Sequence, residues 1–270
     1  MKKLILGFFA VVLCAVYALP AEAKIDIVPR RVVIEGRSKS GEITILNLGS
    51  KPMGYRIGII NYKQDENGVY TLLNAPLNPV FDPEKYVRLS PRQFTLPVGG
   101  RQKIRFSVRV PPDLPQGEYR FHIAANSLAP VDPGPQEKRG ASVGLRINLG
   151  VSIPVIYRHG ALSATAKIED ARWITAQQSE QGANGMLVTI ARQGTSSTIG
   201  LLEVYWTPAG GTEEKIGYVV NANVFTDVPR RTVFVPLQSI PQGSGTIRVR
   251  YLNDIGARKG ELYDEIIRQQ

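Results

Sequence analysis

Histidine and cysteine, which often serve as catalytic bases, thiol nucleophiles and metal ligands, are scarce in this chain. The histidines are His122 and His159, and the single cysteine is Cys14. His122 has no second histidine or cysteine at the spacing of a zinc site, and packing in or beside a strand explains both histidines better. The sequence also has no G-x-S-x-G motif and no phosphate-binding glycine loop. It therefore predicts a protein that is not an enzyme and that holds no metal and no cofactor.

The stretch SVGLRINLGVSIPVIYRHG carries a pattern suited to binding. Every second residue over positions 143–155 is a large aliphatic, which predicts a strand with one apolar face. Such a strand would extend about 43 Å, whereas the usual strand has only about 5–6 residues. Pro154 has no backbone N–H and therefore belongs at a sheet edge or a bulge. The aliphatic residues are Val143, Leu145, Ile147, Leu149, Val151, Ile153 and Val155.

Soluble proteins usually blunt a long apolar edge strand with charges or bulges, and the 143–155 face is not blunted. We expect its C-terminal half to fill the core of its own sandwich and its N-terminal half to project beyond that core. A membrane barrel would need about eight or more such segments, and this chain has one. The remaining role is to complete the sheet of another protein, with main-chain hydrogen bonds for affinity and alternate side chains for specificity.

Basic residues form a second candidate binding feature. The formal net charge is +10, and Arg101, Lys103, Arg105 and Arg109 share one face of an expected strand. We favour a solvated face or edge protection for this stripe. A site for a carboxylate, an acidic partner or an anionic membrane surface is the alternative, and charge alone leaves the choice open.

The N-terminus has the features of an export signal. Lys2 and Lys3 precede an apolar run over residues 4–19, and an A-x-A cleavage site ends at Ala23. This pattern predicts that residues 1–23 form a signal peptide and that the mature chain begins at Lys24. Removal of Cys14 with this segment leaves no disulfide. We expect a mature protein outside the cytoplasm, with no membrane insertion and no nucleic acid as its partner.

The rest of the chain shows short β-rich runs between Gly, Pro and Asn residues, which is typical of sandwiches. Pro29 lies inside the first run, so this run should be an edge strand or should bend from one sheet to another. Residues 128–140 look like a flexible loop before the long strand. We expect two tandem antiparallel sandwiches, at residues 24–158 and 159–270, with a mobile or partly helical tail over 257–270.

Several stretches in combination resemble the periplasmic chaperones of the chaperone–usher pilus pathway. They are RRVVIEG near the mature start, LSPRQFTLPVGGRQKIRF with LPQGEYRFHI, and the alternating strand that ends in IPVIYRHG. The resemblance covers most of residues 24–160 and is weaker beyond them. It implies an all-β fold of two immunoglobulin-like sandwiches set at an angle, and a location in the periplasm.

The same resemblance implies how the protein would act. The last strand of the first domain would enter the open groove of a pilus subunit and cap it until delivery to an outer-membrane usher. The subunit-binding residues would be Val143, Leu145, Ile147, Leu149, Val151 and Ile153. Arg31 would anchor the carboxylate at the subunit's C-terminus. Ser152 stands where the family has a second anchoring lysine, so another cation, such as Arg101, Lys103 or Arg105, would have to replace that lysine.

Two other functions fit the sequence less well. A structural or adhesive sandwich protein could pair its long strand permanently with its own kind, but the 128–140 loop and the absence of a groove-filling N-terminal extension favour a transient donor. A cationic polyanion-binding module would show strong salt dependence and would be indifferent to changes at Ile147.

Overall fold

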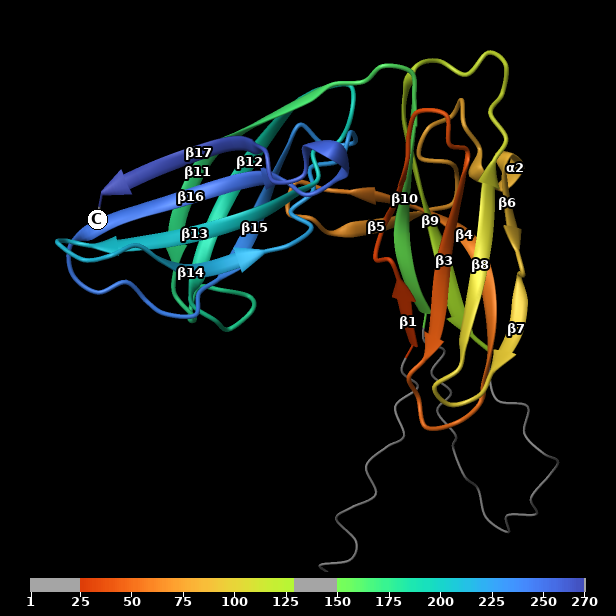
Figure 1. Cartoon of the computed structure of the whole chain (residues 1–270), viewed down its shortest axis with the longest axis horizontal. Coiled ribbons are helices and arrows are strands. Elements are labelled where there is room, and N and C mark those ends of the chain that lie inside the picture. The colour runs from red at the N-terminus through yellow and green to blue at the C-terminus, as the bar shows by residue number, and fades with distance from the viewer. Residues whose placement is uncertain (1–24, 129–149, 270) are drawn as a thin grey trace, which may run out of the picture.

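The computed structural model describes residues 25–128 and 150–269, without the side chain of Ala257. Two β-sandwiches lie end to side, set at an angle to each other (Figure 1). The sheets of β1–β10 form the first and those of β11–β17 form the second. The predicted all-β fold of two immunoglobulin-like sandwiches is confirmed.

The first sandwich has a four-stranded sheet in the order β1-β3-β8-β6 and a larger sheet in the order β2-β10-β9-β4-β5, with β7 also paired to β4. A short helix, α2 (Pro83–Tyr86), precedes β6. Tyr119 of β9 donates its hydroxyl to the carbonyl oxygen of Pro115 at 2.7 Å, as in the tyrosine corner of immunoglobulin-like sandwiches. The strands are β1 (Ile25–Val28), β2 (Val32–Ile34), β3 (Ser40–Asn47), β4 (Met53–Gln64), β5 (Tyr70–Leu73), β6 (Val87–Ser90), β7 (Gln93–Leu96), β8 (Arg101–Val108), β9 (Gly117–Ser127) and β10 (Gly150–His159).

The second sandwich packs the sheet β11-β12-β15 against the sheet β14-β13-β16-β17. Its last strand corrects the expectation for the C-terminus, because residues 262–269 pair antiparallel with β16 instead of forming a mobile or helical tail. A single 3₁₀ turn, η1 (Gly256–Arg258), precedes that strand. The strands are β11 (Ala164–Ile174), β12 (Gly185–Gly194), β13 (Gly200–Pro208), β14 (Glu214–Val219), β15 (Arg230–Pro236), β16 (Gly245–Asn253) and β17 (Leu262–Gln269).

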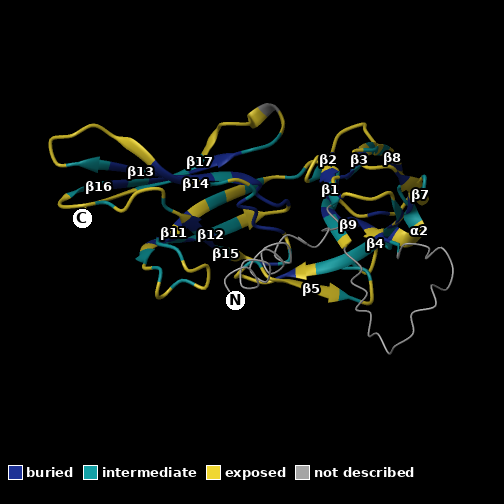
Figure 2. Ribbon diagram, turned by 90° about the horizontal axis from the view of Figure 1, so that it is seen from below, coloured by how far each residue is buried: buried dark blue, intermediate teal, exposed yellow. Residues whose placement is uncertain are grey.

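Period-two alternation decides which side chains enter each core. In β8, Ile104, Phe106 and Val108 are buried, whereas Arg101, Lys103 and Arg105 are exposed. Since successive side chains of a strand point to opposite faces, the aliphatic set faces the opposing sheet and the basic set faces solvent. Figure 2 shows exposed residues gathered in the loops and at β5, with buried residues along the packed sheets.

The run that begins at Ile25 crosses between the two sheets of the first sandwich, which is one of the two arrangements that Pro29 predicts. β1 pairs antiparallel with β3, and after Pro29 the chain continues as β2, which pairs parallel with β10. Proline cannot donate to a ladder, so the position where the chain leaves one sheet suits it. This crossing places residues 29–31 at the edge of the sandwich, between two strands of different sheets.

Candidate functional site

Among the described residues, the N-terminal part of β10 is hydrogen-bonded to a neighbouring strand on only one side, although β1 also lies close to β10. β9 pairs with all of β10, from Gly150 opposite Asn126 to His159 opposite Gly117. β2 covers the other side only at residues 155–157 of β10. Residues 150–154, including Pro154, therefore form an open edge in the part of the chain that the structure describes. This edge is the direct continuation of residues 143–149.

The predicted donor residues fall into two groups. Val143, Leu145, Ile147 and Leu149 lie outside the described residues. Val151 is half-buried against the first core, and Ile153 is 3% exposed within that core. This burial corrects the predicted set at its C-terminal end, because the Ile153 side chain already packs inside its own sandwich and is not free for another groove. Val155 is buried in the same core, as expected for this half of the strand.

Arg31 lies just before β2 and points to the second sandwich. Its Nη2 is 2.8 Å from Oδ2 of Asp254 and 3.1 Å from the Asp254 carbonyl oxygen. Its Nη1 donates to Oδ1 of Asn221. The crossing at Pro29 thus carries Arg31 to the junction of the two sandwiches, where its side chain is 16% exposed and paired with a carboxylate.

The position expected for a second anchoring cation is neutral. Ser152 lies half-buried on β10, opposite Ala124 of β9. The suggested replacements are misplaced, because Arg101, Lys103 and Arg105 lie on the outer face of β8, in the sheet that does not contain β10. Lys103 and Arg105 also pair there with Glu42, at 2.8 Å and 3.4 Å. The structure therefore supports a role for this stripe in covering the sheet with solvated charge.

A residue that sequence reasoning did not single out supplies a cation near Arg31. Lys259 follows η1, and its Nζ lies 3.1 Å from Oδ1 of Asp254. Neither Asp254 nor Lys259 belongs to a recognisable motif, and Asp254 is separated from Arg31 by 223 positions. Spacing in the sequence carries no signal for such a contact, which depends on how the two sandwiches meet.

A buried ion pair of the first sandwich is hydrogen-bonded to the second. Nε of Arg158 lies 3.0 Å from Oε2 of Glu118, and the same oxygen accepts from the Ser197 backbone N–H at 3.0 Å. Nη2 of Arg158 donates to the Ser197 carbonyl oxygen at 3.0 Å. The first-sandwich pair Arg158–Glu118 thus contacts Ser197 of the second sandwich from two sides and positions that sandwich against β9 and β10.

Apolar and hairpin contacts complete the junction. Ile156 on the outer side of β10 packs with Ile199 and Phe225 of the second sandwich. The β4–β5 hairpin reaches the second sandwich (Figure 1), where the carbonyl oxygen of Glu66 accepts from the Thr232 N–H at 2.7 Å. The relative position of the two sandwiches therefore depends on contacts from several separate segments.

The histidines lie in packed environments. His122 is buried against the rings of Tyr62 and Tyr70. Burial, and to a smaller extent the charge of Arg120, lowers the pKa of His122 to about 3. His159 lies beside Tyr157, whose hydroxyl is 3.4 Å from its Nδ1. Within the described ranges, no group of three or more His, Cys, Asp or Glu residues could hold a metal ion.

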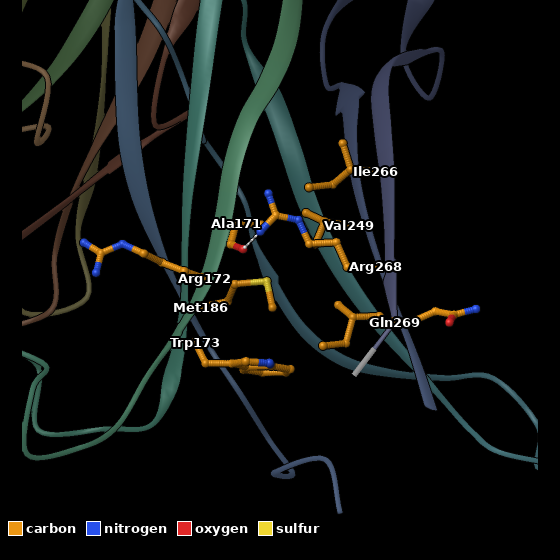
Figure 3. Close-up of a pocket in the computed structure, with 9 residues that line it drawn as sticks. Ala171, Arg172, Trp173, Met186, Val249, Ile266, Arg268 and Gln269 are labelled. Atoms are coloured by element: carbon orange, nitrogen blue, oxygen red, sulfur yellow. Dashed lines mark hydrogen bonds between the residues drawn. The ribbon is translucent and has the colours of Figure 1, made fainter. Parts of the chain in front are cut away.

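A cavity of about 310 Å³ lies in the second sandwich, away from the junction. Figure 3 shows Trp173, Met186, Val249 and Ile266 around it, with the Arg268 guanidinium donating to the Ala171 carbonyl oxygen, at 2.7 Å. A second contact joins Arg268 to Asp170 at 3.3 Å. Arg172 also lines the cavity, with its Nε 4.0 Å from Oδ2 of Asp170. Both arginines at this mostly apolar cavity are therefore already paired.

Comparisons with known proteins find similarity in solved structures. No family model matches, and no curated protein matches. The structure is similar to the E. coli chaperone DraB, at 12% identity and a TM-score of 0.45, over 91% of this chain and 96% of that one. It is also similar to the Pseudomonas aeruginosa CupB2 chaperone, at 12% identity and a TM-score of 0.43, over 91% and 98%.

A third similar structure is Salmonella enterica SafA pilin in complex with the SafB chaperone, at 15% identity and a TM-score of 0.42, over 93% of this chain and 99% of that one. Solved structures of pilus and fimbrial chaperones are therefore among those similar to this chain over most of its length. As for membrane association, the described residues include no helix that is long and apolar enough to cross a bilayer.

Proposed function

We propose that this protein is a periplasmic chaperone that captures pilus subunits by donor-strand complementation and delivers them to an outer-membrane usher. The observation that carries the proposal is the open edge at residues 150–154 of β10, which continues the alternating aliphatic residues 143–149. An open edge can pair with an incoming strand, and alternate side chains can then fill the partner's groove. The domain limits 24–158 and 159–270 belong to the same proposal.

Apolar burial supplies the main binding free energy in this proposal. Each of Val143, Leu145, Ile147 and Leu149 would gain about 1.5–3 kcal/mol from complete burial in a subunit groove, before the cost of ordering the segment. The role involves no chemical step and needs no cofactor. Arg31 contributes a charged contact, because a guanidinium can bind the subunit's terminal carboxylate through two hydrogen bonds.

The decisive experiment is purification of the tagged mature protein from the periplasm of its native host, followed by mass spectrometry of what accompanies it. We expect a small stoichiometric partner with the wild type and none with Ile147→Asp, while both proteins keep the same far-UV circular dichroism. Full recovery of the partner with Ile147→Asp would exclude the donor strand. Wild-type protein that emerges alone or as a stable homopolymer would favour a structural sandwich.

A further inference from the structure

The Arg31 guanidinium is already paired with a carboxylate of the second sandwich. The Asp254 side chain and carbonyl oxygen and the Asn221 side chain together accept from both terminal nitrogens of Arg31. Asn221 has a φ of 59°, a left-handed conformation that asparagine adopts more readily than most other residues. Residues from two separate loops of the second sandwich therefore converge on one arginine of the first.

A second cation meets the same carboxylate from its other side. Oδ2 of Asp254 faces Arg31 and Oδ1 faces Lys259, at 2.8 Å and 3.1 Å. Burial alone would raise the pKa of Asp254, but hydrogen bonds and charges from Arg31 and Lys259 outweigh burial and lower it. The Lys259 side chain is 69% exposed, so this two-cation site is open to solvent on the lysine side.

We propose that Asp254 is an internal substitute for the carboxylate of a captured subunit, and that Lys259 is the second cation of that site. This inference rests on the proposed function. On capture, the incoming carboxylate takes the place of Asp254 between the same two cations. The two cations hold one carboxylate both in the free protein and in the complex with a subunit. The half-buried Arg31 is therefore paired in both states.

The exchange makes capture selective. Asp254 competes with every incoming carboxylate. The apparent affinity of the site for a carboxylate is therefore the intrinsic affinity multiplied by the fraction of molecules in which Arg31 is free. A small carboxylate has nothing else to offset this reduction. A subunit that also pairs with the donor strand gains apolar burial at the same time, so it can displace Asp254 where a free carboxylate does not.

Acetate tests the site without any subunit. The ¹⁵N–¹H signal of Arg31 Nε, assigned by its loss in R31K, is followed during titration with sodium acetate, against sodium chloride at equal ionic strength. We expect D254N to bind acetate at least about tenfold more tightly than the wild type. Adding K259Q to D254N should abolish the tighter acetate binding. Adding K103Q instead should leave it intact, because Lys103 pairs with Glu42 away from this site. Equal responses of wild type and D254N would overturn the role of Asp254, and an unchanged response in D254N/K259Q would overturn that of Lys259.

Subunit release tests the exchange in the complex. The dissociation rate of the co-purified subunit should be several-fold lower from D254N and several-fold higher from K259Q than from the wild type. Release at the wild-type rate from both variants would overturn the inference and leave the proposed function standing. Conversely, an acetate response in D254N together with a wild type that captures no subunit would remove the proposed function and leave a carboxylate site.

The source of the carboxylate can be separated in the same assay. A subunit lengthened by three C-terminal glycines has its terminal carboxylate displaced from the site. If the terminal carboxylate is the ligand, as we infer, this subunit should dissociate from wild type and K259Q at the same rate. A difference that persists would assign the contact to an acidic side chain of the subunit and overturn the terminal assignment.

Discussion

Arg120 of β9 and Asp227 of the second sandwich form an almost fully buried ion pair, with Nη2 2.6 Å from Oδ2 and side chains 1% and 7% exposed. The same Asp227 oxygen accepts from the Gln64 N–H at 2.7 Å, and the Arg120 guanidinium lies over the Phe225 ring, 4.1 Å from its centroid. One carboxylate of the second sandwich thus contacts two strands of the first at the junction of the sandwiches.

Loss of that carboxylate should be costly. Asp227→Ala leaves the Arg120 charge buried without its partner, and we expect a loss of about 3–5 kcal/mol in the free energy of unfolding. Urea unfolding measures this loss. Arg105→Ala is the matched control, because the Arg105–Glu42 pair is exposed and such pairs contribute about 1 kcal/mol or less. Similar losses in the two variants would contradict the importance of the buried pair.

His122 should make the stability of the protein depend on pH. Its folded-state pKa of about 3 lies below the unfolded value near 6.5, so between these values the unfolded chain binds a proton that the folded chain does not. Stability from this group is complete above about pH 6.5 and decreases on acidification by about 1.4 kcal/mol per pH unit.

The variant His122→Phe isolates this contribution, since phenylalanine fills a similar volume among the rings of Tyr62 and Tyr70 and cannot titrate. Urea unfolding of both proteins at pH 7, 6 and 5 gives the comparison. The wild type should lose more stability than the variant as the pH falls, and parallel curves would show that folding does not lower the pKa of His122.

Gly68, at the tip of the β4–β5 hairpin, should not tolerate a side chain. Its φ is +86°, and an added Cβ would lie 2.7 Å from Nη2 of Arg231 in the second sandwich. We expect Gly68→Ala to cost about 1–2 kcal/mol of unfolding free energy. Gly58→Ala in β4 has no atom within 4 Å of the added carbon, so a similar loss there would show that space and φ at Gly68 are not the cause.

The two halves of the long strand should respond differently to the same substitution. Ile153→Ala removes a core side chain of the first sandwich and should cost about 2–5 kcal/mol of unfolding free energy. Ile147→Ala should change this free energy by less than about 0.5 kcal/mol while weakening subunit capture. Denaturation of each free variant, followed by a pull-down of the subunit, would test the division, which fails if Ile147→Ala destabilises the free chain as much as Ile153→Ala.

Arg31→Ala should weaken subunit capture by about 2 kcal/mol or more of binding free energy, because a buried charge contact is lost. Arg30→Ala is the matched control, since Arg30 is the preceding residue and its side chain is 76% exposed, 3.6 Å from Asp26. Quantitative recovery of the complex with both variants measures the difference. Equal recovery would remove Arg31 from the site.

The β pattern and its punctuation were enough to predict most elements of the fold. Pro29 inside an aliphatic run predicted an edge strand or a strand that changes sheets, and the alternation in β8 predicted which side chains enter the core. The C-terminal strand was missed. Residues 262–269 mix charged and apolar side chains as many exposed segments do, and they are strand because the edge of β16 is available to pair with them.

The sequence by itself determined the properties that depend on neighbouring residues: the strands, their apolar faces, the edge position of Pro154 and the repeated sandwich pattern. Alternation along a strand is local, so it can be recognised without a partner. Tertiary structure alone decided that Arg31 and Lys259 both pair with Asp254, and that the basic stripe of β8 lies in the sheet that does not contain β10. Arg31 and Asp254 are distant in the chain, and only the packing of one sandwich against the other brings their charges within hydrogen-bonding distance.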